Sequence, residues 1–243
     1  MKIIEADTVT PYILNSLPIG VGTTAICFCL LDGRVFKYYI NTRQTMLMFA
    51  NPHFKAKLER ISTITNDSYV GPQELLFIKG ELKGYFYPYV EGKTLKSTRK
   101  DITLSELFRN YEKLLTDTIE VSKKGFTLYD LHDRNIIFND YFNIIDLDRC
   151  YFENDKFEHT LRINLRTISE TILGYIFKTE PWQTINIYDR DLQYIYYNTD
   201  WQNLDEVDAL IKMISDKCND ADPTVKTIRK KIKYVKEYNE YYR

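Results

Sequence analysis

The spacing of apolar residues differs between the two parts of the chain. In the first part, short apolar runs bounded by glycine and other turn residues predict β-strands. These runs cover residues 19–31, which a glycine-rich turn interrupts, and then 34–39, 74–78 and 82–90. Asp32-Gly33 and Lys79-Gly80 predict hairpin turns between neighbouring runs. Residues 51–64 have apolar side chains at helical spacing and predict one helix in this part.

Helical spacing dominates after Gly92. Helices are predicted over 103–124, 163–177, 204–218 and 225–242, and residues 180–203 predict helix plus loop. Thr103 followed by Glu106 resembles a capping box, and Gly125 suits the end of the first of these helices. A strand-rich segment 1–92 and a helix-rich segment 93–243 therefore predict an α+β protein with two unequal lobes around a cleft.

Composition and charge exclude several classes of protein. The chain of 243 residues is 44% hydrophobic and 28% charged, which is typical of a globular protein. Its formal net charge is -1, so no overall charge favours nucleic acid or an anionic membrane. The basic residues of segment 225–242 are expected to form a solvated face rather than a nucleic-acid site.

The sequence shows no targeting signal, and together with the cysteine spacing this leads us to expect a cytoplasmic protein. No apolar run approaches the roughly 18 residues of a membrane span, and the N-terminus lacks the apolar core of a signal peptide. The four cysteines lack the spacing of zinc ligands, so we expect them to be reduced and buried: Cys27, Cys29, Cys150 and Cys218.

Three polar side chains with the spacing needed for phosphoryl transfer lie in the middle of the chain. Asp130 and Asn135 are five positions apart, and Asp146 follows eleven positions later. One aspartate, Asp130, can receive a proton from an acceptor hydroxyl. Asn135 and Asp146 can hold Mg²⁺ (or Mn²⁺) beside the phosphates of ATP. The alternative is a turn in which Asp130 and Asn135 only make local hydrogen bonds.

Candidate nucleotide-binding residues precede this centre. The glycines of the turn Gly20-Val21-Gly22-Thr23 let backbone N–H groups approach phosphate, although a plain hairpin explains the pattern equally well. Lys37 lies in an otherwise apolar, aromatic strand. It is either an edge lysine pointing to water or a lysine that holds the α- and β-phosphates and pairs with a helix glutamate. Glu59 is the first candidate for that glutamate, and Glu74 is the second.

The end of the last predicted strand suits adenine. Pro88 cannot donate a ladder hydrogen bond, which is harmless where a strand ends in a linker. The Pro88 carbonyl and the N–H of Val90, two residues on, are the predicted partners of the adenine edge.

Taken in order, these motifs resemble those of the protein-kinase-like superfamily over nearly the whole chain. Gly20-Val21-Gly22-Thr23-Thr24-Ala25 resembles its glycine-rich loop, with alanine in place of the third glycine. Asp130-Leu131-His132-Asp133-Arg134-Asn135 resembles its catalytic loop, and Asp146-Leu147-Asp148 its Asp-Phe-Gly segment. Lys37 and Glu59 take the places of its strand lysine and helix glutamate. The resemblance implies an N-lobe (1–92) with a small antiparallel sheet and one main helix, and a mostly helical C-lobe (93–243).

The departures from the family pattern indicate an atypical member. Leu128-Tyr129 replaces a His-Arg pair, which removes the arginine that would bind a phosphorylated activation loop. Only a short segment separates Asp146 from Asn164, which resembles the start of the central helix with asparagine for the usual aspartate. His132 is similar to the histidine of aminoglycoside and choline kinase-like enzymes. It either packs the loop or contacts the acceptor.

The resemblance implies an ATP- and Mg²⁺-dependent phosphotransferase, and three classes stay open. The first is a Ser/Thr protein kinase, which the last two predicted helices favour. The second is a small-molecule kinase for a sugar, antibiotic or amino alcohol, which His132 and the short segment after Asp146 favour. The third is a pseudokinase that binds nucleotide without transfer. Retention of Lys37 and the three central residues argues against it. Asp133 and Asp148 are expected to be supporting or surface carboxylates.

Overall fold

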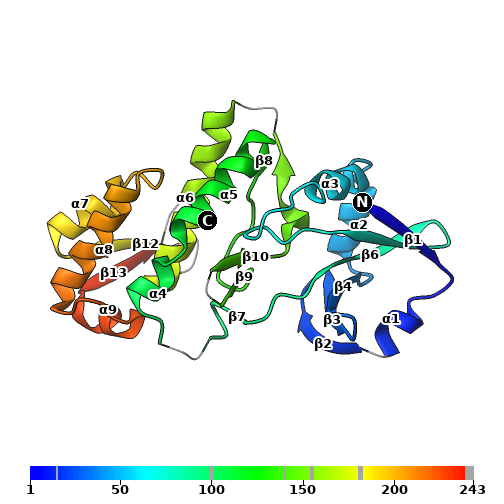
Figure 1. The fold of residues 1–243 in the computed structure, drawn as a ribbon, viewed down its shortest axis with the longest axis horizontal. Helices are drawn as coiled ribbons and strands as arrows, with labels where there is room; N and C mark the ends of the chain where they lie inside the picture. Colours follow the sequence, from blue (N-terminus) through cyan, green and yellow to red (C-terminus); the bar gives the residue numbers. More distant parts are fainter. Residues whose placement is uncertain (15, 99–100, 140, 154–155, 180–182, 239–243) are drawn as a thin grey trace. The chain divides into compact units, whose positions relative to one another are not determined.

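The chain folds into two compact units. A computed structural model describes residues 1–14, 16–98, 101–139, 141–153, 156–179 and 183–238. The first unit comprises Met1–Glu91 and Ile145–Arg149, and the second comprises Gly92–Ile144 and Cys150–Arg243. Figure 1 traces the elements of both units in chain order. The division at Gly92 lies next to the predicted boundary, whereas segment 145–149 belongs to the first unit although the sequence predicts it in the second.

The first unit is built on a six-stranded sheet with the order β1-β5-β6-β4-β3-β2. Its strands are β1 (Lys2–Ala6), β2 (Ser16–Val21), β3 (Ala25–Leu30), β4 (Arg34–Tyr39), β5 (Glu74–Ile78) and β6 (Glu81–Pro88). The predicted hairpins β2–β3, β3–β4 and β5–β6 are confirmed as antiparallel pairs. The expectation of a purely antiparallel sheet is wrong, because β1 pairs with β5 in parallel and Ile4 and Ala6 pack on the core there.

The helices of the first unit are more numerous than predicted. They are α1 (Thr10–Leu14), α2 (Arg43–Ala50), α3 (Phe54–Ile61) and the short 3₁₀ helix η1 (Leu147–Arg149). Helix α3 confirms the helix predicted over 51–64 and buries Phe54, Leu58 and Ile61. In helix α2, the apolar residues Met46 and Leu47 are exposed to solvent. The helix therefore lacks a buried apolar stripe, which is the pattern that predicts a surface helix from sequence.

Strand β4 presents different chemistry on its two faces. Phe36 packs in the apolar core, with its ring centroid 4.8 Å from that of Phe86. Lys37 and Tyr39 share the opposite face, because side chains alternate along a strand. There Lys37 lies opposite Tyr85 of β6, with Nζ 5.6 Å from the Tyr85 ring centroid. Since β4 lies between β6 and β3, Lys37 is not an edge residue.

The second unit is mainly helical. Its helices are α4 (Leu104–Phe108), α5 (Tyr111–Lys123), α6 (Phe157–Phe177), α7 (Arg190–Asn198), α8 (Leu204–Cys218) and α9 (Val225–Lys231). Its short strands are β7 (Lys93–Thr94), β8 (Phe126–Thr127), β9 (Ile136–Phe138), β10 (Phe142–Ile144), β11 (Tyr151–Phe152), β12 (Gln183–Ile187) and β13 (Tyr234–Tyr238). Helices α5 and α6 lie side by side (Figure 1). The helices predicted over 163–177 and 204–218 are confirmed by α6 and α8.

The helix predicted over 103–124 is divided in two. The predicted capping box forms at Thr103, but α4 ends at Phe108 and α5 begins at Tyr111. The break lets both aromatic residues face Trp201: Phe108 stacks on its ring at 6.2 Å between centroids, and the Tyr111 hydroxyl donates to its carbonyl at 2.6 Å. A tertiary contact thus interrupts a segment that is helical in its local pattern.

The prediction of a helix over 225–242 is wrong beyond Lys231. Helix α9 ends there, and β13 follows as the antiparallel partner of β12. Tyr234 packs on Phe177 with 5.2 Å between ring centroids. Arg229 donates to the carbonyls of Tyr175 and Ile176 near the end of α6. This arginine therefore satisfies backbone carbonyls instead of lying on a free solvated face.

Two further expectations can be compared with the structure. Within the described ranges, no helix is long and apolar enough to cross a membrane. The four cysteines all lie in the described ranges, and they form no disulfide bond with one another. Cys150 and Cys218 are buried as expected, whereas Cys27 and Cys29 are half-buried.

Gly84→Ala in β6 is expected to destabilise the protein by about 1–3 kcal/mol, because it overpacks the contact between β4 and β6. An alanine Cβ there would lie 2.1 Å from the Lys37 carbonyl oxygen and 2.8 Å from Phe36 Cε2. Gly20→Ala in β2 is the matched control, since the nearest atom to its Cβ is 4.0 Å away. Urea unfolding measures both variants, and equal midpoints would contradict the close approach of β4 and β6.

Candidate functional site

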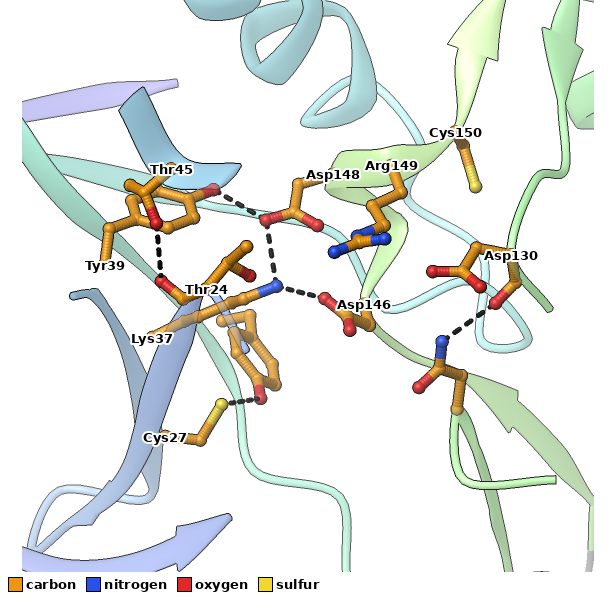
Figure 2. Close-up of polar contacts among 12 residues, drawn as sticks. Thr24, Cys27, Lys37, Tyr39, Thr45, Asp130, Asp146, Asp148, Arg149 and Cys150 are labelled. Carbon is orange, nitrogen blue, oxygen red and sulfur yellow. Dashed lines mark hydrogen bonds and ion pairs between the residues drawn. The ribbon is translucent and has the colours of Figure 1, made fainter. Parts of the chain in front are cut away.

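The Lys37 side chain ends in a buried group of charges within the first unit, which we call the Lys37 cluster: Lys37, Tyr39, Asp146 and Asp148. Lys37 Nζ forms ion pairs with Asp146 and with Asp148, whose Oδ2 lies 2.8 Å away. The Tyr39 hydroxyl donates to the same Oδ2 at 2.7 Å. Figure 2 shows Lys37 pointing at both carboxylates. Lys37 is only 5% exposed, which excludes the alternative of a lysine in water.

Segment 145–149 is attached to the first unit at several points. Asp146 has a φ of 66°, a conformation that costs free energy in residues other than glycine and often marks functional sites. Helix η1 follows, and its Leu147 and Asp148 are buried. Lys57 of α3 donates to the backbone carbonyl of Asp148, and Arg149 donates to Gln44 of α2 at 3.3 Å. The segment is thus held by both strand and helix side chains.

The two carboxylates of the cluster have different ionisation behaviour. Burial raises the pKa of Asp146, and the charge of Asp148 adds to this effect while Lys37 opposes it. Burial also tends to raise the pKa of Asp148, but Lys37 and Tyr39 together hold that pKa below its usual value. Burial alone would lower the pKa of Lys37, yet Asp148 and Asp146 raise it. The ammonium group of Lys37 thus pairs with both carboxylates, and Asp148 is the more deeply enclosed of the two.

The structure does not bring the predicted helix glutamate to Lys37. Glu59 instead forms an ion pair of 4.0 Å with Lys55, and its side chain is 45% exposed. Helix α3 turns Leu58 toward the core, which directs its neighbour Glu59 to another face. The second candidate, Glu74, pairs with Arg34 at 2.5 Å and with Lys2 at 3.1 Å. Both glutamate assignments are corrected, because the acidic partners of Lys37 are Asp146 and Asp148.

Asp148 and Tyr39 are the members of the cluster that sequence reasoning missed. Asp148 is 1% exposed, so it is not the surface carboxylate that was one of its two expected roles. The available signal was alternation on β4, which puts Tyr39 on the same face as Lys37. No local pattern marks Asp148, because its contacts with Lys37 and Tyr39 join residues more than a hundred positions apart.

The glycine-rich turn joins β2 and β3 as predicted. The Gly22 N–H donates to the Ala25 carbonyl at 2.8 Å and closes the turn. Gly20-Val21-Gly22-Thr23 is exposed throughout, whereas Thr24 is buried. Its glycines do not adopt the left-handed region, so the turn itself does not require them. Their use for close approach to phosphate stays a prediction.

The predicted adenine-binding segment follows the end of β6. Pro88 is the last residue of that strand and is exposed, and Val90 is half-buried. The Tyr89 N–H between them donates to the Gly33 carbonyl at 3.0 Å. The contacts of Pro88 and Val90 with adenine stay predictions.

Asp130 and Asn135 lie together on a loop of the second unit. Asn135 Nδ2 donates to the backbone carbonyl of Asp130 at 3.0 Å, and the Asn135 N–H donates to the His132 carbonyl at 2.8 Å. Asp130 is exposed and has a φ of 61°, which is again a sparsely populated conformation. The bond from Asn135 uses its amide nitrogen, so Oδ1 remains the atom suited to a metal ion.

The residues between these two support the loop. His132 Nδ1 accepts a hydrogen bond from the Arg134 N–H at 3.3 Å. Asp133 forms an ion pair with Lys96 at 3.6 Å, and its carbonyl accepts from the Lys96 N–H at 3.0 Å. Asp133 is thus joined to Lys96, and a contact of His132 with the acceptor stays a prediction.

Asn164 of α6 anchors the chain just before the loop. Its Oδ1 accepts from the Leu128 N–H at 2.7 Å, and its Nδ2 donates to the Phe126 carbonyl at 2.8 Å and to Ser122 Oγ at 2.9 Å. Asn164 is fully buried. An amide can both accept and donate, so one neutral side chain satisfies three buried groups, and the nearest of them, the Leu128 N–H, is two residues before Asp130.

The Lys37 cluster has a donor set that suits Mg²⁺. Its two carboxylates face one ammonium group, which leaves an excess of negative charge when both are ionised. Asp146 has a side chain that is 36% exposed and can reach a ligand. Asp148 Oδ1 is buried without a hydrogen-bond partner in the described structure. Magnesium in phosphotransfer sites needs one or two carboxylates plus phosphate oxygens rather than a complete protein cage. The described residues contain no cluster of three or more acidic, histidine or cysteine side chains that could hold a metal ion by themselves.

Comparison with known proteins does not assign the chain to a family. No protein-family model matches the sequence, and no curated protein matches it significantly. The functional conclusion therefore rests on the residues and their geometry.

Asn164→Ala is expected to lower the stability of the protein by about 2–4 kcal/mol, because it removes the buried hydrogen bonds that Asn164 makes to the Leu128 N–H and the Phe126 carbonyl. Ser122→Ala is the matched control, since it removes only one of the three bonds. Urea unfolding measures both, and hydrogen exchange at Leu128 reports on the loop directly. Unchanged exchange at Leu128 in Asn164→Ala would contradict the anchoring role.

Proposed function

We propose that the protein is an ATP- and Mg²⁺-dependent phosphotransferase that transfers the γ-phosphoryl group to a hydroxyl group. The observation that carries the proposal is the buried ion pair between Lys37 and Asp146. The sequence motifs assign these two residues independently to the phosphates and to the metal ion, and they are 109 positions apart. Burying a lysine is costly unless its charge is compensated, so chance burial beside that aspartate is a poor explanation.

The role proposed for each group is the one that the sequence motifs assign to it. Lys37 holds the α- and β-phosphates against the face of β4, while Gly20-Val21-Gly22-Thr23 offers backbone N–H groups to phosphate. Asp146 and Asn135 hold Mg²⁺, which neutralises charge on the phosphates when bound. Pro88 and Val90 contact adenine. Transfer then depends on positioning and charge more than on covalent chemistry by the protein.

Asp130 is the proposed proton acceptor. The acceptor hydroxyl oxygen forms a bond to the γ-phosphorus as the bond to the β–γ bridging oxygen breaks, and ADP leaves. Asp130 takes the hydroxyl proton. Two observations support this role. Asp130 is exposed, and Asn135 Nδ2 donates a hydrogen bond to the Asp130 backbone carbonyl, which fixes the backbone that carries the carboxylate.

The acceptor proposed first is a serine or threonine of a protein, as the family resemblance implies. A small hydroxyl compound is the second candidate. It is favoured by the short chain after the Asp146 loop, where β11 ends at Phe152 and α6 begins at Phe157. This leaves little room for a segment that could hold a peptide. Strand β13 also replaces part of the last predicted helix, which was one of the two helices that favoured a protein acceptor.

Asp146→Asn is expected to abolish the Mg²⁺-dependent part of ATP binding, because it removes the exposed carboxylate of the Lys37 cluster. Isothermal titration of the full chain with ATP, with and without Mg²⁺, measures this. Asp208→Asn on the exposed side of α8 is the control and should bind as the wild type. Wild-type affinity of Asp146→Asn in Mg²⁺ would refute the assignment of the metal site.

Asp130→Asn is expected to lower phosphoryl transfer by at least about 10²-fold, the usual range for a proton-transfer group, while ATP affinity stays unchanged. Transfer from γ-labelled ATP is followed to the chain itself, to added protein and to small hydroxyl compounds. Label on protein supports the first acceptor class, and turnover only with a small hydroxyl compound supports the second. ATP binding without any transfer by the wild type would identify a pseudokinase and overturn the proposal.

A further inference from the structure

We infer that Asp148 is the residue that positions Lys37 for ATP, in the role that the sequence pattern assigns to Glu59. This inference rests on the proposed function. The Asp148 side chain is 1% exposed and lies 2.8 Å from Lys37 Nζ. Glu59, by contrast, is 45% exposed and pairs with Lys55. Of these two acids, only Asp148 has the contact needed to orient the lysine.

Strand β4 fixes the orientation of this carboxylate at two points. Lys37 and Tyr39 extend from the same face of the strand, and both donate to Oδ2 of Asp148. Oδ1 has no hydrogen-bond partner in the described part of the chain. The direction of the carboxylate is therefore set by Lys37 and Tyr39. Groups held on a regular strand are placed more accurately than groups held on loops.

One short loop thus carries two carboxylates with separate tasks. Asp146 has a side chain that is 36% exposed, so a metal ion can reach it. Asp148, two residues on, is enclosed and compensates the lysine. Helix α3 participates through Lys57, which donates to the backbone carbonyl of Asp148. The placement of Lys37 consequently depends on segment 145–149 and not on a carboxylate of α3.

The first test compares ATP affinity in Mg²⁺ among variants of the full chain. Asp148→Asn is expected to weaken ATP binding at least about tenfold, as expected for loss of one partner of a buried charge pair. Asp148→Glu, which keeps the charge, should bind more tightly than Asp148→Asn. Glu59→Gln should stay within about twofold of the wild type, since its partner is an exposed lysine. Tyr39→Phe removes only one hydrogen bond and should cause a smaller loss, which keeps the test valid if Asp148→Asn does not fold.

The second test needs no nucleotide and uses the midpoint of urea unfolding. Lys37→Met leaves the buried Asp148 charge uncompensated and should lower the midpoint. Adding Asp148→Asn to Lys37→Met should raise the midpoint again, because the uncompensated charge is removed. Adding Glu59→Gln to Lys37→Met should not change it.

The outcomes separate this inference from the proposed function. Weak ATP binding by Asp148→Asn together with recovery of stability in the double variant supports the inference. Loss of affinity in Glu59→Gln equal to that in Asp148→Asn, or no recovery in the double variant, overturns it while leaving an ATP-binding protein. If the wild type binds no ATP, the proposed function fails and the role of Asp148 toward ATP fails with it. Recovery of stability would then still identify Asp148 as the counter-charge of Lys37.

Discussion

The charge of Lys37 is the constraint on which the first unit depends. An ammonium group enclosed by a sheet must be compensated, and β4 supplies no acid of its own. The compensation comes from Asp146 and Asp148, which are far along the chain. Both acids lie in segment 145–149. This segment therefore belongs to the first unit, although the residues on either side of it in the sequence belong to the second. The same contacts bring together the groups to which we assign phosphate and metal binding.

In the second unit, neutral hydrogen bonds hold the backbone that precedes the loop with Asp130 and Asn135. Asn164 of α6 satisfies the Leu128 N–H and the Phe126 carbonyl. A neutral amide avoids the cost of desolvating a charge while still fixing the backbone. The Lys37 cluster thus carries charge where a charged ligand is proposed, whereas a neutral side chain, Asn164, fixes the backbone before the loop.

Sequence patterns were most reliable where structure is local. The Asp32-Gly33 turn, the hairpins around it, and helices α6 and α8 follow from turn chemistry and periodicity over a few residues. The patterns failed where a distant partner decides. Trp201 breaks the helix predicted over 103–124, and pairing with β12 turns part of the predicted last helix into β13. A helical pattern in the sequence cannot show that the same residues will instead pair with a distant strand.

In the candidate site, too, some features follow from the sequence and others depend on contacts between distant residues. The sequence by itself determined the candidates for the proposed chemistry, because Lys37, Asp130, Asn135 and Asp146 are residue types suited to it and occur in the order of the motifs. Alternation of side chains along a strand also places Tyr39 on the face of Lys37, but the contact of Tyr39 with Asp148 became evident only in the folded chain. Only the tertiary structure decided which acid compensates Lys37. Glu59 and Asp148 both carry a carboxylate, and the sequence does not show which of them contacts Lys37. The choice depends on which one the packing of α3 and η1 on the sheet encloses, and that is a property of the folded chain.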